Sequence, residues 1–308
     1  MHTILGAGGV VANEVVKELR KNNTPYQLVS RKPKPAEGER SIAADLLDAQ
    51  AVKDAVRGSS MVYLVAGLEY NIRVWQNLWP KIMSNTIEAC KTANAKLIFF
   101  DNVYAYGLVK GTMTESTPYN PSSKKGEVRA RIATQLMDET RHGNLKALIA
   151  RAADFYGPKY DKSVIGIMAF ERLAKGGSAM LMMSDKTVHS YTFTPDIGKA
   201  LFTLSQNDSS FNQVWHVPTA SDPLTGKQFV EQIAAAFGVK SRYSVLGKFM
   251  MSMLGIFNHD IKEVVEMLYQ WEFDYIFDSS KFEKAFGVQA TSYEVGIKEA
   301  AATYRPRV

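Results

Sequence analysis

Short apolar runs alternate with stretches of helical periodicity along the first half of the chain. After the first run, for example, Val11, Val15, Val16 and Leu19 recur at the spacing of one helix face. This alternation is typical of a parallel sheet that helices cover on both faces, so it predicts a doubly wound α/β fold. The expected strands are Thr3–Leu5, Tyr26–Ser30, Ser41–Ala43, Met61–Ala66, Leu97–Phe100 and Ala147–Ala150.

Helices are expected between these strands. The pattern places them at Asn13–Lys21, Ala49–Arg57, Ile72–Ala93 and Pro121–Arg141. The last of them has the clearest start and stop signals, since Asn120 would cap it and Pro121 would open it.

The strict alternation ends after Gly157-Pro158. Helices are expected at 164–175, 195–204 and 225–237, and strands at 189–193 and 214–217. A methionine-rich apolar segment, Leu246–Phe257, favours a core helix, with the lining of a pocket or a partner interface as the alternatives.

A glycine-rich turn follows the first strand directly. A G-x-x-G-x-x-G/A pattern fits Gly6, Gly9 and Ala12, whereas G-x-G-x-x-G fails at Val11. Small residues let backbone N–H groups approach a pyrophosphate, whose charge then rests on the start of the following helix. The turn therefore predicts dinucleotide binding, although a tight turn without a ligand would use similar residues.

These patterns together predict two domains. We expect a dinucleotide-binding domain over residues 1–158, with returning elements at about 186–218. A smaller, discontinuous substrate lid is expected over residues 159–185 and 219–308.

Composition narrows the class of protein. The chain has 308 residues, of which 46% are hydrophobic and 22% charged, as in ordinary globular proteins. No apolar run approaches the ~20 residues of a membrane span, and the first strand begins at once, so we expect a cytoplasmic protein with no membrane partner. Five histidines and one cysteine show no metal-ligand spacing, so no metal is expected.

The net charge of +6 would be compatible with a protein that binds nucleic acid. The basic residues are dispersed and aromatic residues do not interleave with them, so no nucleic-acid partner is expected and an anionic small ligand explains the excess equally well. One basic pair stands out, because Arg31 and Lys32 follow the second strand. An acidic residue there would bind the ribose of NAD, whereas a cation suits the 2′-phosphate of NADP. NADP is therefore the favoured cofactor and NAD the second choice, with a basic surface loop as the alternative.

Four segments of the chain occur in the order that is typical of extended short-chain dehydrogenases/reductases. They are Asp45-Leu46-Leu47-Asp48, Leu64-Val65-Ala66-Gly67, Asp101-Asn102-Val103-Tyr104-Ala105-Tyr106-Gly107 and Arg151-Ala152-Ala153-Asp154-Phe155-Tyr156-Gly157-Pro158. The chain thus resembles the NAD-dependent epimerase/dehydratase family, from the first strand to about Pro195-Asp196. The resemblance implies a Rossmann fold with a substrate lid, a small-molecule substrate and a possible homodimer through the two long helices.

The resemblance also assigns the cofactor-binding positions. Gly6, Ala7, Gly8, Gly9, Val10 and Val11 would cradle the pyrophosphate. Asp45 and Leu46 would border the adenine, and Val65, Ala66 and Gly67 would pass beneath the ribose and the nicotinamide. The alternative for each is simple support of the fold.

The catalytic pattern departs from the family. Its members use a tyrosine, a lysine four residues later and a Ser or Thr, because a phenol of pKa near ~10 needs a nearby cation to act at neutral pH. Here Asn120 and Pro121 stand four residues before Lys124 and Lys125, so the tyrosine is missing from its expected position. Lys125 is the preferred cofactor-orienting lysine, with Lys124 as the alternative.

Three further residues are candidates for the missing chemistry. The Ser/Thr position falls on Asn102, which can donate a hydrogen bond but cannot relay a proton as a hydroxyl does. Tyr104, expected on the same strand face, and Tyr119, in the loop before the helix, are the candidate phenols, with packing at a strand end as the alternative for both.

Three charged side chains lie outside that pattern. Arg129 is expected on a solvated helix face, or facing a substrate phosphate, and Arg151 is expected to pair with a carboxylate. His189 stands where the family often places a substrate-contacting cation, although a structural histidine is the alternative.

Two hypotheses of function follow. The first is an NAD(P)-dependent oxidoreductase, epimerase or dehydratase that acts on a small hydroxylated or carbonyl substrate, with Lys125, Asn102 and Tyr104 or Tyr119 in the catalytic site. The second is a catalytically silent NADP(H)-binding redox sensor or scaffold protein, which the missing tyrosine suggests.

Overall fold

The structure, a computed structural model, describes residues 1–158 and 163–304. The chain divides into two compact units. The first contains Met1–Gly107, Tyr119–Ala152 and Ile197–Val217, and the second contains Leu108–Pro118, Ala153–Asp196 and Pro218–Val308. Within the described residues, no helix has the length and apolar character that crossing a membrane requires.

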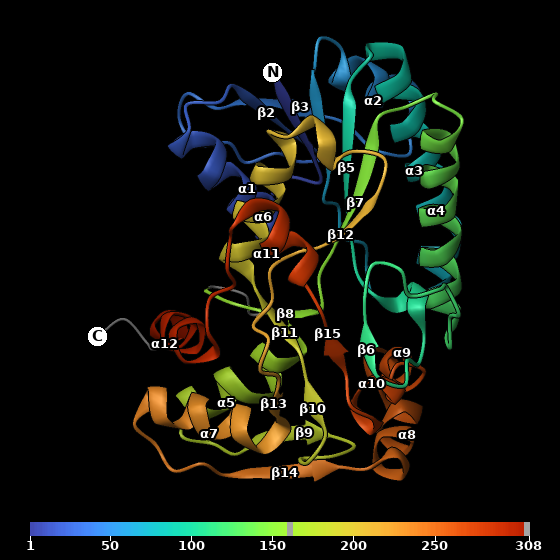
Figure 1. Cartoon of the computed structure of the whole chain (residues 1–308). Helices are drawn as coiled ribbons and strands as arrows, with labels where there is room; N and C mark the ends of the chain where they lie inside the picture. Colours follow the sequence, from blue (N-terminus) through green and yellow to red (C-terminus); the bar gives the residue numbers. More distant parts are fainter. Residues whose placement is uncertain (159–162, 305–308) are drawn as a thin grey trace. The chain divides into compact units, whose positions relative to one another are not determined.

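A seven-stranded sheet forms the centre of the first unit (Figure 1). Its strands are β1 (His2–Leu5), β2 (Tyr26–Ser30), β3 (Arg40–Ala43), β4 (Met61–Leu64), β5 (Lys96–Asp101), β7 (Ala147–Arg151) and β12 (Val214–His216). Their order is β12-β7-β5-β4-β1-β2-β3, and every neighbouring pair is parallel. The doubly wound parallel sheet expected from the sequence is thus confirmed.

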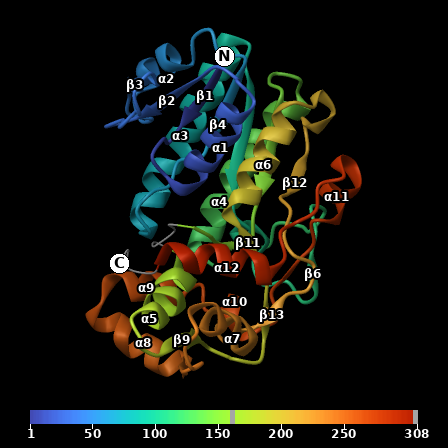
Figure 2. The same cartoon turned by 90° about the vertical axis from the view of Figure 1, so that its left-hand side faces the viewer.

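Helices cover both faces of this sheet, which is why β4 and β7 are buried along their whole length. One face carries α1 (Val10–Lys21) and α6 (Thr194–Ser205), which lie side by side in Figure 2. The other face carries α2 (Ala49–Val56), α3 (Ile72–Ala93) and α4 (Lys124–Arg141), and α3 packs against both of its neighbours.

The predicted start of α4 is wrong. The helix begins at Lys124, where the Ser123 side chain caps it by accepting a hydrogen bond of 3.0 Å from the Gly126 N–H. Asn120 instead donates its backbone N–H to the carbonyl of Ala105, over 3.1 Å, so this segment is held against the loop after β5.

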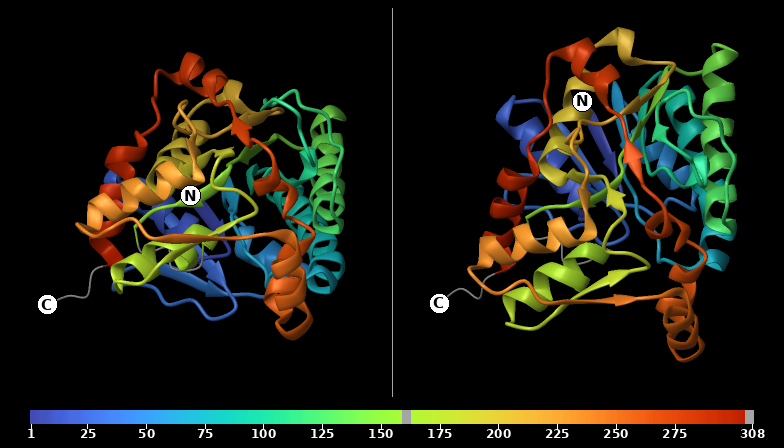
Figure 3. Two further views of the ribbon diagram at one scale, coloured as in Figure 1. Left: turned by 90° about the horizontal axis from the view of Figure 1, so that it is seen from below. Right: turned by 60° about the horizontal axis from the view of Figure 1, so that its bottom comes forward.

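The second unit is built from short strand pairs and from helices that surround an aromatic core. The pairs are β6 (Thr112–Met113) with β15 (Ile276–Phe277), β8 (Asp154–Tyr156) with β11 (Tyr191–Phe193), β9 (Ala179–Met182) with β14 (Tyr243–Leu246), and β10 (Val188–His189) with β13 (Leu224–Thr225). The single strand expected at 189–193 is therefore divided between β10 and β11. Around the core pack α5 (Glu171–Ala174), α7 (Gly226–Phe237) and α12 (Tyr293–Tyr304), which Figure 3 shows from below.

The remaining helices of this unit are α8 (Lys248–Phe257), α9 (His259–Val265), α10 (Tyr269–Glu272) and α11 (Ser280–Phe286). In α8 only Met251 and Gly255 are buried, whereas Phe249, Ile256 and Phe257 are 78%, 75% and 86% exposed. The expectation of a core helix in this segment is therefore wrong, because α8 packs through one narrow side against α9 and leaves its other apolar side chains outside.

Candidate active site

The turn after β1 presents bare backbone. Gly6 and Gly8 both have φ of +96°, a conformation that side chains with a Cβ rarely adopt. A Cβ at Gly6 would lie 2.4 Å from the Cα of Ala66, so the two loops approach each other at backbone distance. A Cβ at Gly8 would meet no atom within 4 Å, so the outer side of the turn is open to a ligand.

The start of α1 is suited to an anion. Gly9 is its N-cap, no side chain caps the helix, and no acidic residue lies in the first turn. The first N–H groups of a helix lack partners within the helix and carry its positive end. The residues of the turn therefore fit a pyrophosphate group.

The ends of the next strands carry the positions expected around the adenosine. Arg31 and Lys32 follow β2, are exposed, and have no ion-pair partner among the residues that the structure describes. Asp45 is exposed, and its carboxylate accepts a hydrogen bond of 3.0 Å from the Leu47 N–H, while Leu46 is buried. After β4, a Cβ at Gly67 would again meet no atom within 4 Å.

The first turn of α4 places Lys125 inside the protein. Its side chain is fully buried, and its Nζ lies 4.7 Å from the centre of the Tyr70 ring. The hydroxyls of Tyr70 and Tyr104 are 3.4 Å apart, and the Tyr104 ring stacks on Trp75. The structure thus brings Lys125 and Tyr104 to the same aromatic group.

The sequence predicts Tyr104 on the same strand face as Asn102, and this prediction is wrong. Tyr104 begins a 3-10 turn, Tyr104–Tyr106, because β5 ends at Asp101 and the Asn102 side-chain oxygen accepts the Tyr104 N–H over 3.0 Å. The local hydrogen bond of the Asn102 side chain replaces the strand pairing that would have continued the alternation.

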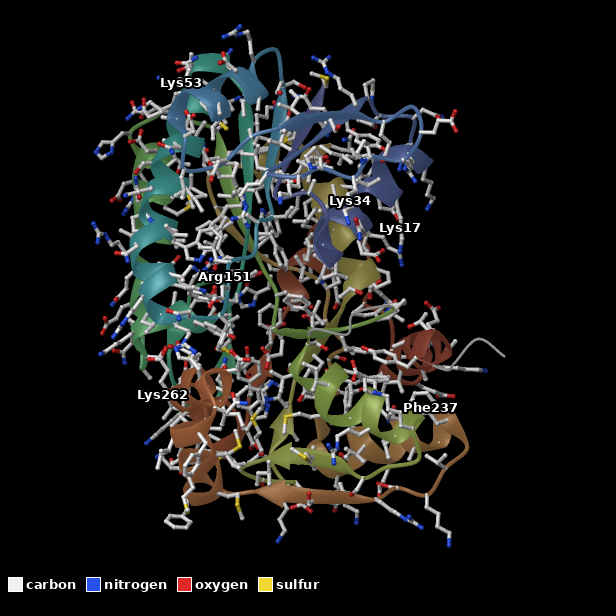
Figure 4. The ribbon with its side chains drawn as sticks, turned by 180° about the vertical axis from the view of Figure 1, so that it is seen from behind. Lys17, Lys34, Lys53, Arg151, Phe237 and Lys262 are labelled. Carbon is white, nitrogen blue, oxygen red and sulfur yellow. The ribbon has the colours of Figure 1, made fainter. Side chains whose placement is uncertain are left out.

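A buried charged cluster lies at the carboxyl ends of β5 and β7. Asp101 Oδ1 accepts a hydrogen bond of 2.7 Å from Arg129 Nε, and its Oδ2 accepts one of 3.2 Å from Arg151 Nε. Asp101, Arg129 and Arg151 are 1%, 4% and 0% exposed. Figure 4 labels Arg151 among the inner side chains, whereas Lys53 lies at the outer edge of the drawing.

The expectation for Arg151 is confirmed, and that for Arg129 is wrong. Arg129 does not lie on a solvated face, because its guanidinium is paired with Asp101 and stacks over Trp79, whose ring centre is 4.4 Å from the guanidinium carbon. Helix α3 covers this side of α4 and excludes the solvent from it.

The Arg151 guanidinium packs on two neighbouring rings, with its central carbon 4.7 Å from the ring centre of Tyr119 and 4.6 Å from that of Tyr106. The two ring centres are themselves 6.1 Å apart. Arg151 Nη2 donates a hydrogen bond of 2.7 Å to the Tyr119 hydroxyl. The Tyr106 hydroxyl lies 2.9 Å from His216 Nε2, and burial raises the pKa of Tyr106 to about 12, so Tyr106 stays protonated at neutral pH. The two candidate phenols, Tyr104 and Tyr119, therefore have different neighbours.

Residues 2–217 match the model of the NAD dependent epimerase/dehydratase family. The chain belongs to this family. No curated protein sequence matches it.

Solved structures of epimerases and dehydratases share the fold. The UDP-glucose 4-epimerase of Thermus thermophilus, crystallised with NAD, superimposes with a TM-score of 0.81 at 18% identity over 100% of both chains. A double mutant of DesIV, the dTDP-glucose 4,6-dehydratase of Streptomyces venezuelae, crystallised with NAD, gives a TM-score of 0.80 at 17% identity over 100% of this chain and 97% of that one.

In this member of the epimerase/dehydratase family, the structure adds two candidate site residues that the sequence analysis did not single out. Asp101 and His216 stand at the ends of buried strands, where a charged or polar residue after an apolar run is the available signal. Nothing in the sequence indicated that Asp101 serves two arginines. The described residues contain no group of three or more His, Cys, Asp or Glu that could hold a metal ion.

His189 lies in the second unit. Its Nε2 is 3.1 Å from Asp154 Oδ2, and its ring stacks on those of Tyr275 and Trp271. It also lines a small apolar pocket within that unit, together with Met168 and Met182. These contacts hold His189 in the core of the unit, and its contact with a substrate stays a prediction.

Proposed function

We propose that the chain is an NADP(H)-dependent oxidoreductase of the extended short-chain type, acting on a small hydroxylated or carbonyl compound. The family and the fold support a nicotinamide dinucleotide as the cofactor. The observation that carries the choice of NADP is the pair of exposed cations, Arg31 and Lys32, directly after β2. A guanidinium can bind a 2′-phosphate through two parallel hydrogen bonds.

The residues of the first unit have separate roles in this proposal. The turn from Gly6 to Val11 holds the pyrophosphate, Asp45 and Leu46 border the adenine, and the segment Val65–Gly67 lies beneath the ribose and the nicotinamide. Lys125 orients the nicotinamide ribose, and Asn102 donates a hydrogen bond to the substrate oxygen. The bound cofactor supplies or accepts a hydride.

Binding is tested by thermal unfolding with NAD, NADH, NADP and NADPH in turn. A ligand at a hundredfold excess over its Kd stabilises the folded chain by about 2.7 kcal/mol, so binding is seen as a raised midpoint. We expect the largest rise with NADP or NADPH. An equal or larger rise with NAD and NADH contradicts the NADP preference, and no rise with any of the four contradicts the proposed function.

Turnover is tested by following the loss of reduced nicotinamide with a panel of small aldehydes, ketones and keto sugars. We expect substrate-dependent oxidation of NADPH that ceases when the substrate is used up. Cofactor binding with no turnover across oxidoreductase, epimerase and dehydratase assays would instead support a silent sensor.

A further inference from the structure

The cluster around Asp101 contains more positive than negative charge. Arg129 and Arg151 both pair with this one carboxylate, and all three residues are buried. One positive charge is therefore left over in a region from which water is excluded. A buried charge without compensation is costly, so the cluster favours negative charge on a group that touches it.

Tyr119 is placed to carry that negative charge. A guanidinium has only donors, so the Tyr119 oxygen must be the acceptor in its 2.7 Å hydrogen bond with Arg151 Nη2. The hydroxyl proton of Tyr119 consequently points away from Arg151. A fixed phenol with an oriented proton is what a proton donor requires.

The other phenol beside Arg151 is less suitable. Tyr106 is 1% exposed and its hydroxyl is already within 2.9 Å of His216 Nε2. Tyr119 is only partly buried, and its hydroxyl is held beside Arg151 at the carboxyl end of β7. Parallel α/β sheets bind their substrates at this edge. The geometry therefore singles out Tyr119.

We infer that Tyr119 is the proton donor to the substrate oxygen and that Arg151 is its positioning residue. This inference rests on the proposed function. In the reducing direction, the cofactor's hydride forms the new C–H bond at the carbonyl carbon, and the C=O π electrons move to the oxygen. The oxygen takes the Tyr119 proton, the phenolate that remains lies against Arg151, and solvent returns the proton. Tyr119 and Arg151 thus supply the phenol and the cation beside it from a loop and from β7, while Lys125 keeps its role of orienting the cofactor.

The first experiment needs no substrate. Carbon-13 at Cζ of the tyrosines gives one NMR line per ring, and the line missing from Tyr119→Phe identifies Tyr119. We expect this line to move when NADP is added to saturation. The line of Tyr26, at the amino end of β2 and identified through Tyr26→Phe, is expected to stay in place.

The thermal-shift measurement separates the two possible failures. If NADP stabilises the chain but the Tyr119 line does not move, Tyr119 is remote from the reacting centre and the inference is overturned while the proposed function stands. If no dinucleotide stabilises the chain, the proposed function itself fails, and the role of Tyr119 fails with it.

The second experiment uses the carbonyl compound that the wild-type chain reduces fastest. Loss of a general acid typically lowers kcat by about 10²- to 10⁴-fold, and we expect this for Tyr119→Phe with an unchanged Kd for NADP. Tyr26→Phe is the matched control and should keep its activity. Full activity in Tyr119→Phe, or a loss confined to Tyr104→Phe, would overturn the inference.

The role of Arg151 is tested by comparing two substitutions. Arg151→Lys keeps the charge and a donor, so it should retain more of kcat than Arg151→Met, with similar KM values in both. Their folding is checked by circular dichroism, because both change a buried ion pair. If Arg151→Lys and Arg151→Met both fold and have equal kcat values, Arg151 does not position Tyr119. If Arg151→Met does not fold, the NMR line of Tyr119 in Arg151→Lys must still move when NADP is added.

Discussion

The turn after β1 and the cluster at the ends of β5 and β7 belong to the same sheet but use different chemical groups. The turn from Gly6 to Gly9 offers backbone N–H groups and requires only that side chains be absent. The cluster depends on charged side chains from two strands and a helix, namely Asp101, Arg151 and Arg129. A backbone site survives most changes elsewhere in the chain, whereas a side-chain site can be rebuilt from new residues. Under the proposed function, this difference explains how the chain can keep a cofactor-binding turn while its catalytic residues depart from the pattern of the family.

The largest effect is expected from removing the shared charge of the cluster. In Asp101→Asn two buried guanidinium groups lose their carboxylate, and breaking a buried ion pair in this way costs about 3–5 kcal/mol of unfolding free energy. Urea unfolding followed by tryptophan fluorescence measures this loss, since Trp75 and Trp79 lie beside Arg129.

The matched control for this variant is Asp54→Asn. Asp54 pairs with Arg57 on the surface, and such pairs contribute only about 0–1 kcal/mol. If Asp101→Asn is no less stable than Asp54→Asn, the cluster does not hold the ends of β5 and β7 together, and the comparison with the backbone turn loses its basis.

The sequence predicted the regular part of this fold well. The six strands expected in the first half all exist, and the helix at Ile72–Ala93 has the predicted bounds. The alternation of apolar runs with helical stretches indicates strands that are buried on both faces of a parallel sheet. The glycine spacing indicates a backbone conformation that residues with a Cβ rarely adopt. Both are local properties of the chain, so they can be recognised without knowledge of the tertiary structure.

The candidate site was harder to predict because its contacts are not local. Arg151 is 32 residues from Tyr119 and 50 from Asp101 along the chain, and no pattern of spacing connects them. The prediction that Asn120 caps α4 is wrong because the Asn120 backbone N–H is hydrogen-bonded to the loop after β5, and Ser123 caps the helix instead. The predicted exposure of Arg129 is wrong because the packing of α3 against α4 decides it.

The next largest effect concerns the turn, through Gly9→Asp. Gly9 has no positive φ, and a Cβ there meets only Gly6 O at 3.9 Å, so an aspartate fits and would cap α1. Its carboxylate would repel the pyrophosphate, and like charges brought together cost several kcal/mol, which corresponds to a loss of NADP affinity of about 100-fold or more. Isothermal titration calorimetry measures the affinity, and the thermal midpoint should not fall.

Gly247→Asp provides a matched control for this variant. Gly247 is also an N-cap with open space around it and no side-chain cap, but it begins α8 in the second unit. It should bind NADP as the wild type does. An equal loss of affinity in both variants would show that the effect is not specific to the β1–α1 turn, and retained affinity in Gly9→Asp would show that the turn does not hold the pyrophosphate.

The smallest effect is expected at Arg31, whose side chain is proposed to select NADP over NAD. In Arg31→Ser the 2′-phosphate of NADP loses one exposed charge-assisted hydrogen bond, and we expect its Kd to rise by about tenfold, or about 1.4 kcal/mol. The Kd for NAD should not change, because NAD lacks this phosphate. Arg40→Ser removes the same charge from the neighbouring strand and should leave both affinities alone. Since exposed charges are screened by salt, the difference between Arg31→Ser and the wild type should shrink as ionic strength rises. An equal rise in both Kd values would mean that Arg31 acts through general attraction of anions and does not select NADP.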